Sequence, residues 1–177
     1  MIFEEKSVTS KEIFKGRIVT LKVDEVEMPD GSLAERELVF HPGGVGVVAI
    51  DEEDRVVLVK QFRKPIEDAI YEIPAGKLDA GEDHRLCGMR ELEEETGLKA
   101  EEFVYLGFIY PSPGFTDEKT HMYLATGLTQ GETHPDPDEY LDIVRMPLNE
   151  VLSKIMKNEI NDAKTVAGIL KAVSLKG

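Results

Sequence analysis

The sequence predicts an α/β domain preceded by a small antiparallel β region. Three observations lead to this fold class. Short segments rich in β-branched residues recur through the 177-residue chain, separated by turn-forming residues. A central segment, residues 76–98, combines a glycine-bounded loop with residues at helical spacing. Two amphipathic patterns typical of helices, Leu148–Lys157 and Ala163–Leu175, end the chain.

The N-terminal segments predict a hairpin. Residues 1–15 are polar and weakly patterned, and we expect a lead-in segment. Gly16–Met28 alternates apolar and polar residues as a half-buried strand does, and Ala34–His41 follows as a second strand. The intervening Pro29-Asp30-Gly31 is typical of a turn. We therefore expect a β region at 1–42 and a main domain at 43–177.

The main domain is predicted to contain six strands. They are Val45–Ile50, Val56–Phe62, Ala69–Ile73, Phe103–Tyr110, Thr120–Ala125 and Tyr140–Met146. Polar loops over residues 111–118 and 131–138 separate the later strands. Neither an internal repeat nor a low-complexity tract is present in the sequence.

Composition excludes several classes of protein. The net charge of −14, without a Lys/Arg cluster, argues against nucleic-acid binding. No apolar run is long enough to span a membrane, and the N-terminus lacks the layout of a signal peptide. A single cysteine, Cys87, excludes an internal disulfide and fits a reducing cytoplasm. We expect Cys87 to be a small, partly buried helix residue rather than a nucleophile.

The central helix carries an unusual group of glutamates. Glu91, Glu94 and Glu95 are spaced i, i+3 and i+4, so their side chains fall within an arc of about 100°. Like charges at this spacing destabilise a helix by roughly 0.2–0.5 kcal/mol per pair. A divalent cation such as Mg²⁺ would offset that repulsion, because it binds carboxylate oxygens and keeps positions open for water and phosphates. An isolated acidic run is more often a solvated face; here the surrounding pattern favours metal binding.

The other faces and ends of this helix also follow from the sequence. Leu86, Met89 and Leu92 recur at helical spacing, and we expect this stripe to pack on the core opposite the glutamates. Acidic Asp83 suits a helix N-terminus, and Gly97 stands where a helix usually ends.

The spacing of this segment resembles a complete Nudix box. Its fixed positions are Gly76, Glu82, Arg90-Glu91-Leu92, Glu94-Glu95 and Gly97-Leu98. The resemblance implies an α/β/α sandwich with a mixed central sheet, in which the box binds Mg²⁺, or Mn²⁺, and hydrolyses a nucleoside diphosphate linked to another group. It further implies that Glu91 and Glu95 are the principal metal ligands, with Glu94 as a further, catalytic one. Glu82 and the carbonyl of Ala75 would complete the metal shell, and Arg90 would hold the glutamates in place.

Three stretches outside the box resemble the ADP-ribose pyrophosphatase sub-family. They are Gln61-Phe62-Arg63, Glu72–Gly76 and Ser112–Glu118, the last with Pro113 fifteen residues after Leu98. By this resemblance Arg63 binds the diphosphate or its ribose, Glu72 positions the sugar or base, and Gly76 approaches the substrate. Pro113, Gly114 and Phe115 would line the pocket for the terminal ribose. The resemblance also implies a cytoplasmic homodimer built by the N-terminal region.

The reaction implied is hydrolysis of ADP-ribose to AMP and ribose 5-phosphate. The sub-family takes its general base from a distant loop, where Glu139 is the best match and Asp138 or Asp136 are alternatives. Rival interpretations are a Nudix hydrolase of another nucleoside diphosphate sugar such as GDP-mannose, a hydrolase of oxidised nucleoside triphosphates, and a ligand-binding sensor. The sequence leaves open the number of metals, the phosphorus attacked and the residues that stack on the base.

Overall fold

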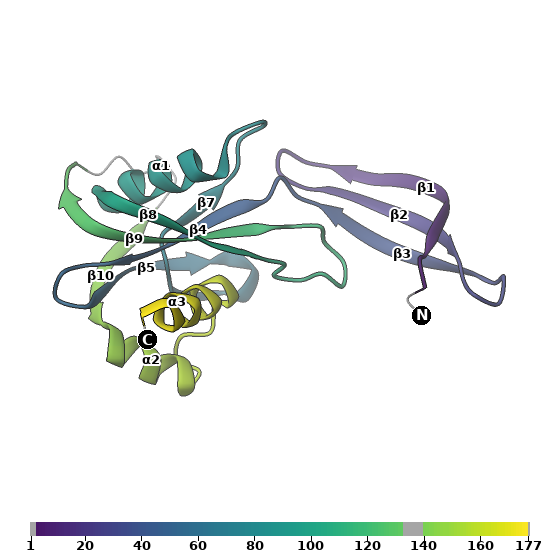
Figure 1. Ribbon diagram of the computed structural model, residues 1–177. Helices are drawn as coiled ribbons and strands as arrows, with labels where there is room; N and C mark the ends of the chain where they lie inside the picture. The colour runs from purple at the N-terminus through teal and green to yellow at the C-terminus, as the bar shows by residue number, and fades with distance from the viewer. Residues whose placement is uncertain (1–2, 133–139, 177) are drawn as a thin grey trace. The chain divides into compact units, whose positions relative to one another are not determined.

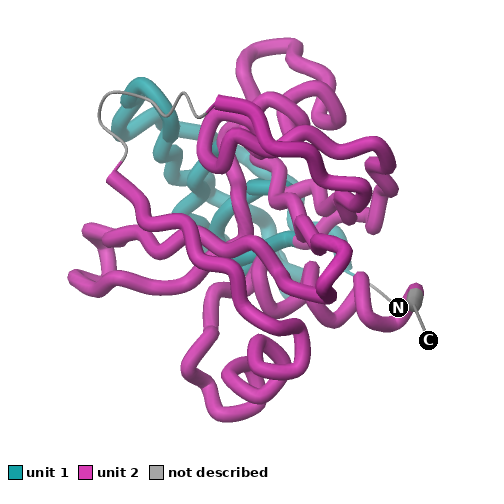
Figure 2. The backbone as a smooth tube through the Cα atoms, turned by 90° about the vertical axis from the view of Figure 1, so that its left-hand side faces the viewer, with its two compact units in different colours: residues 1–43, 110–119 teal, residues 44–109, 120–177 magenta. Residues whose placement is uncertain are grey.

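The computed structural model describes residues 3–132 and 140–176. Two compact units make up the chain: unit 1 contains residues 1–43 and 110–119, and unit 2 contains residues 44–109 and 120–177 (Figure 2). Among the described residues, no helix has the length and apolar character needed to cross a bilayer.

Unit 1 is a small three-stranded antiparallel sheet, which confirms the predicted antiparallel β region and adds one strand to the expected hairpin. Its strands β1 (Lys6–Lys15), β2 (Thr20–Glu27) and β3 (Leu33–Phe40) lie in the order β1-β2-β3. The segment expected to be only a lead-in to the hairpin contains strand β1. Every residue of β1 is exposed, so no buried face imposes an alternating pattern on its sequence. Backbone pairing with β2 holds the strand instead.

The loop of residues 110–119 belongs to unit 1 because it docks on β3. The Val39 N–H donates to the Phe115 carbonyl at 2.8 Å, and the Asp117 N–H donates to the Val39 carbonyl at 3.3 Å. The Asp117 side chain also accepts from the His41 N–H at 2.9 Å. These bonds fix Phe115 and Asp117 to the end of β3 and to the residue that follows it.

Unit 2 is built on one mixed sheet of seven strands. The main path runs β10-β5-β4-β9-β8, with β6 paired to β5 and β7 paired to β4. Strands β4 and β9 are parallel, and the other pairs are antiparallel. The strands are β4 (Gly44–Ile50), β5 (Arg55–Arg63), β6 (Asp68–Glu72), β7 (Ala75–Lys77), β8 (Leu98–Ile109), β9 (Thr120–Gln130) and β10 (Leu141–Pro147).

Helices cover both faces of this sheet (Figure 1). Helix α1 (His84–Thr96) contributes Cys87 and Leu92 to the apolar cluster on one face. Helices α2 (Leu148–Met156) and α3 (Ala163–Lys176) pack with a second cluster on the other face. Each fully buried Val, Leu or Ile in these clusters contributes about 1.5–3 kcal/mol to folding. The predicted α/β/α sandwich with a mixed sheet is thereby confirmed.

Several strand boundaries differ from those predicted. Strand β8 begins at Leu98 rather than Phe103, and β9 continues to Gln130 rather than Ala125. The added residues of β8 include exposed Lys99, Glu101 and Glu102. Because these residues are polar, the sequence does not show the apolar pattern typical of a strand there. Pairing with β9 extends through this part of the ladder and defines the longer strand.

The predicted apolar stripe of α1 is largely wrong. Leu92 is buried, but Leu86 is 61% exposed and Met89 is 38% exposed. The buried face instead carries Cys87, Gly88, Glu91, Leu92, Glu95 and Thr96. Two of the glutamates therefore turn toward the protein, and this brings their carboxylates to the strand that precedes the helix.

Candidate active site

Local sequence sets the two ends of α1. The Asp83 carboxylate accepts from the N–H groups of Arg85 and Leu86, at 2.9 and 3.1 Å, and so caps the helix. Gly97 ends the helix with a positive φ of 70°, and its N–H donates to the Glu93 carbonyl. Glycine tolerates this left-handed conformation without strain. The helix that carries the glutamates thus begins and ends where the sequence predicts.

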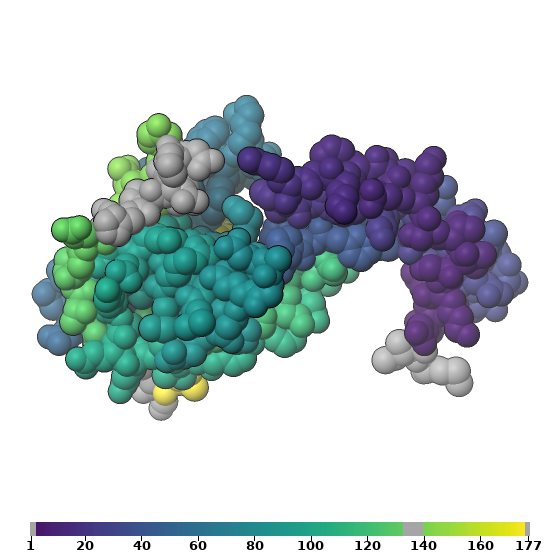
Figure 3. Space-filling model, turned by 90° about the horizontal axis from the view of Figure 1, so that it is seen from above, coloured from purple at the N-terminus to yellow at the C-terminus, as the bar shows by residue number. Residues whose placement is uncertain are grey.

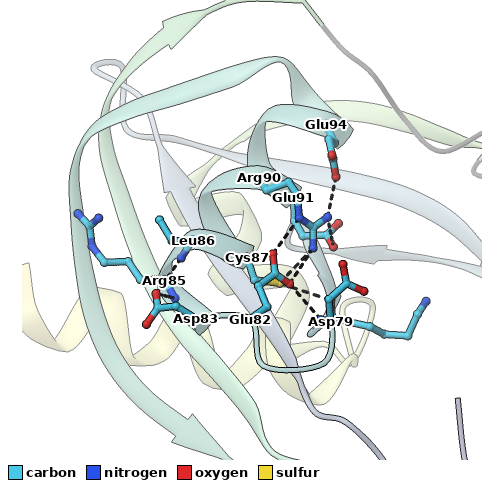
Figure 4. A network of polar contacts seen from close by, with 10 residues as sticks. Asp79, Glu82, Asp83, Arg85, Leu86, Cys87, Arg90, Glu91 and Glu94 are labelled. Carbon is cyan, nitrogen blue, oxygen red and sulfur yellow. Dashed lines mark hydrogen bonds and ion pairs between the residues drawn. The ribbon is translucent and has the colours of Figure 1, made fainter.

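Arg90 lies among the carboxylates of the box (Figure 4). Its Nε and Nη2 donate to the two oxygens of Glu82, each at 3.1 Å. Its Nη1 donates to Glu91 at 3.0 Å and to Glu94 at 2.8 Å. One guanidinium therefore binds three carboxylates, and its fork geometry and charge offset the repulsion expected between them.

These contacts shift the ionisation of neighbouring groups. Hydrogen bonds from the Arg90 side chain and the Asp79 N–H lower the pKa of Glu82 from 4.5 to about 2. The bond to Glu82 is also the main cause that raises the pKa of Arg90. Burial, with the charges of Glu82 and Glu91, raises the pKa of the Cys87 thiol to about 12. Cys87 is therefore a neutral, buried side chain at neutral pH, as expected of a structural residue.

The backbone of β7 lies directly against two of the glutamates. A methyl group at Gly76 would stand 1.8 Å from Cδ of Glu91, so only glycine leaves room for that carboxylate. The Ala75 N–H donates to Oε2 of Glu95 at 3.1 Å. Glu91 and Glu95 are 8% and 3% exposed. Strand β7 and helix α1 thus bring Ala75, Gly76, Glu91 and Glu95 together.

The donor chemistry of this group suits a hard divalent cation. Mg²⁺ binds oxygen ligands, and this group offers carboxylate oxygens beside backbone carbonyl groups. In the part of the chain that the structure describes, no three acidic, imidazole or thiol side chains form a preassembled metal centre. Arg90 instead binds both oxygens of Glu82 and one oxygen each of Glu91 and Glu94. Glu91, Glu94 and Glu95 are the carboxylates that would hold such a cation.

A second charged cluster surrounds Glu72 at the end of β6. Arg63 donates from Nε and Nη2 to the two oxygens of Glu72, at 2.6 and 2.8 Å. Lys164 of α3 also pairs with Glu72. Burial alone would raise the pKa of Glu72, but the hydrogen bonds and charges of Arg63 and Lys164 outweigh it, so the pKa lies below its ordinary value. The bond to Glu72, with the charges of Asp162 and Glu95, raises the pKa of Arg63.

The remaining predicted residues lie elsewhere in the chain. Pro113, Gly114 and Phe115 are exposed members of the loop in unit 1. Glu139, with Asp138 and Asp136, lies outside the described residues. The predicted site residues thus fall into a glutamate cluster around Arg90, an Arg63–Glu72 pair and a loop on the other unit.

Sequence reasoning missed Lys164 and the residues that hold it. Asp162 caps α3 by accepting from the Thr165 N–H and hydroxyl, at 2.9 and 2.7 Å. The Thr165 hydroxyl in turn accepts from the Ile73 N–H at 2.9 Å. The Asp-Ala-Lys-Thr segment signals a helix start. Nothing in it indicates that the helix reaches Glu72, since this contact joins residues 92 apart in sequence.

Known proteins resemble this chain over most of its length. The NUDIX domain model matches residues 40–168, and the model of a nucleoside diphosphate sugar hydrolase N-terminal domain matches residues 5–39. The chain is 48% identical to a methanol dehydrogenase activator of Bacillus methanolicus, over 95% of this chain and 92% of that one. It is 42% identical to an ADP-ribose pyrophosphatase of Bacillus subtilis, over 94% and 91%. A crystal structure of an ADP compounds hydrolase superposes with a TM-score of 0.88 at 21% identity, covering 99% of this chain and 95% of that one.

Proposed function

Because the chain belongs to the Nudix family, we propose that it is a hydrolase that cleaves the pyrophosphate bond of ADP-ribose to AMP and ribose 5-phosphate. The observation that carries the proposal is the gathering of the box glutamates. Arg90 binds Glu82, Glu91 and Glu94. The β7 backbone lies against Glu91 and Glu95. The similarity to an ADP-ribose pyrophosphatase over nearly the whole of both chains supports this substrate.

The glutamates and the β7 backbone would hold a divalent cation, which we propose to be Mg²⁺. Glu91 and Glu95 would be the principal ligands, with Glu94, Glu82 and the carbonyl of Ala75 in support. When bound, the cation neutralises the diphosphate and lowers the pKa of an attacking water. Such charge compensation is needed, because the protein carries a net charge of −14 and its substrate is an anion.

The chain's own residues position the reactants. Arg90 would keep the glutamates in a fixed arrangement, so that little reorganisation is needed during reaction. Arg63 would bind the diphosphate through the N–H groups that Glu72 leaves available. Gly114, with Pro113 and Phe115, would contact the terminal ribose, and Glu139 would serve as general base. These last assignments rest on the resemblance to the sub-family.

A substrate panel tests the proposal. Purified protein is incubated with ADP-ribose or GDP-mannose, with Mg²⁺ or with EDTA, and the products are separated by chromatography. We expect AMP and ribose 5-phosphate from ADP-ribose in the presence of Mg²⁺. Cleavage of GDP-mannose in preference to ADP-ribose would replace the proposed substrate and leave the hydrolase class intact.

The relative from Bacillus methanolicus favours a second candidate function. Its name describes an activator of methanol dehydrogenase, and it is 48% identical to this chain. If this chain activates methanol dehydrogenase, that dehydrogenase should oxidise methanol faster when this chain and its proposed substrate, ADP-ribose, are added. An unchanged oxidation rate, with ADP-ribose hydrolysis intact, would leave only the hydrolase function.

We also propose that residues 1–42 build a homodimer, with residues 43–177 as the hydrolase domain. Strand β1 is exposed along its full length in unit 1, where the space-filling view shows it in purple (Figure 3). Apolar side chains of this unit that are 38–56% exposed include Phe3, Val8, Ile13, Phe14, Ile18, Leu33 and Phe40. Burying such a surface against a second copy would be favourable. The single cysteine, kept as a buried thiol, suits the cytoplasm that we propose as the location.

A further inference from the structure

The Glu72 carboxylate lies too deep to contact a substrate freely. The residue is 1% exposed, and both of its oxygens already accept hydrogen bonds from cations. Leaving such a carboxylate with fewer partners is costly, because a buried charge must be paired and hydrogen-bonded. Glu72 therefore orients Arg63 through their two hydrogen bonds. Any contact that fixes the Glu72 carboxylate also fixes the Arg63 guanidinium.

Arg63 is the member of this cluster that faces solvent. Its side chain is 42% exposed. A guanidinium has five N–H donors, and two bonds from Arg63 go to Glu72. Among the described residues, Glu72 is the one hydrogen-bond partner of the Arg63 side chain, so its other N–H groups are available to an anion. Three residues after Glu72, the Ala75 N–H donates to Glu95, so a short stretch of chain connects this pair to the glutamate cluster.

Lys164 anchors the opposite side of the carboxylate. Its side chain is 17% exposed and pairs with Glu72 and, at 3.1 Å, with Asp162. A second contact fixes the first turn of α3. The Thr165 hydroxyl accepts a hydrogen bond from the N–H of Ile73, the residue after Glu72. Two independent contacts thus tie this helix end to the end of β6. These contacts hold Lys164 beside Glu72.

We propose that Lys164 is a positioning residue of the active site: it holds Glu72 so that Arg63 presents its free N–H groups to the diphosphate in one orientation. This inference rests on the proposed function. It deepens that function by adding a cation from the last helix, and Lys164 itself acts only through Glu72 and Arg63. Preorganisation of this kind lowers the cost of ordering the guanidinium when substrate binds.

A double-mutant cycle on Arg63 and Lys164 tests the proposal. The variants Lys164→Met, Arg63→Met and the double variant are assayed for kcat and KM with ADP-ribose. We expect Lys164→Met to lower kcat/KM on the order of tenfold, mainly through KM, because it weakens binding of the diphosphate. In the Arg63→Met background the same change should alter kcat/KM less than about twofold, since the residue through which it acts is gone.

Two further variants separate positioning from a general structural effect. Lys164→Arg keeps a cation and should restore most of the wild-type kcat/KM. Lys171→Met removes a lysine from the same helix, where its Nζ donates to the Leu106 carbonyl at 3.0 Å, and should leave the KM for ADP-ribose unchanged. If Lys164→Met fails to fold, Lys164→Gln retains a donor without the charge and enters the same cycle.

The outcomes are distinct. An effect of Lys164→Met that is as large without Arg63 as with it, or one that Lys171→Met reproduces, overturns the proposal. An unchanged kcat/KM in Lys164→Met overturns it as well. If the wild type fails to hydrolyse ADP-ribose, the proposed function fails by itself, and the same cycle is then measured with GDP-mannose.

Discussion

At the level of single residues, Arg90 connects most of the candidate site. Arg90 binds carboxylates that precede it, adjoin it and follow it in sequence, so one side chain connects the loop before α1 to the helix. Charge-assisted bonds of this kind are about twice as strong as neutral ones. Ionised Glu82 is therefore part of the folded state, which makes stability depend on pH.

Glu82→Gln should remove this dependence. The folded-state pKa of about 2 lies below the ordinary 4.5, so ionised Glu82 stabilises the protein above about pH 4.5, and this contribution is lost as pH falls toward 2. At pH 6 we expect the variant to be less stable by about 1 kcal/mol, because solvent screens part of the interaction. Urea unfolding at pH 6 and pH 2.5 measures the difference, which should shrink at the lower pH. The exposed Glu101→Gln serves as control, and an equal loss at both pH values would contradict the prediction.

At the level of elements, the site depends on the close approach of α1 to β7. Gly76 of β7 leaves space for the Glu91 carboxylate. Gly88 of α1 leaves space for Val45 and Phe103. The two glycines thus permit different contacts: one with a proposed metal ligand, the other with the apolar core. Substitution at each should have different consequences.

Gly76→Ala should impair metal use, and Gly88→Ala should impair stability. The added methyl at Gly76 would displace Glu91, so we expect the Mg²⁺ concentration for half-maximal activity to rise at least about tenfold. At Gly88 the methyl would stand 2.8 Å from Val45, and overpacking of a core costs roughly 1–3 kcal/mol. Mg²⁺ titrations and thermal melts of both variants separate the effects. An unchanged Mg²⁺ requirement in Gly76→Ala would argue against Glu91 as a ligand.

How far the sequence predicts an element depends on what buries it. The core strands β4 and β5 carry dense β-branched runs and appear where they were expected. Strand β1 has no buried face, so periodicity could not reveal it. In α1 the glutamates occupy part of the buried face and Leu86 lies outside it, because contacts with Arg90 and β7 replace apolar packing. Lys164 shows the same limit at longer range, since only the fold brings it to Glu72.

At the level of the whole molecule, the sheet of unit 1 carries the surface on which we base the proposed dimer. Three strands need a packed apolar face to be stable by themselves, and this sheet exposes several large apolar side chains. The chain's acidic charge adds long-range repulsion between copies, so dimer formation should strengthen with salt.

Substitution in β1 should dissociate the proposed dimer. Val8 is 56% exposed on this strand, and Val8→Asp would place a charge in the expected interface. We expect wild-type protein to sediment as a dimer at micromolar concentration and Val8→Asp to sediment as a monomer. Lys11→Gln changes the net charge by the same amount on the same strand without removing an apolar group, and should remain dimeric. A monomeric wild type would refute the dimer.

The most direct test of the account is the effect of Glu95→Gln on metal-dependent product formation. Glu95 is buried against Ala75, whereas Glu93 of the same helix pairs with Lys99 at the surface. With ADP-ribose and Mg²⁺ we predict AMP and ribose 5-phosphate from the wild type and from Glu93→Gln, and a loss of at least about a hundredfold in kcat for Glu95→Gln. Wild-type rates in Glu95→Gln, or equal turnover in EDTA, would contradict a metal-assisted hydrolase built on these glutamates.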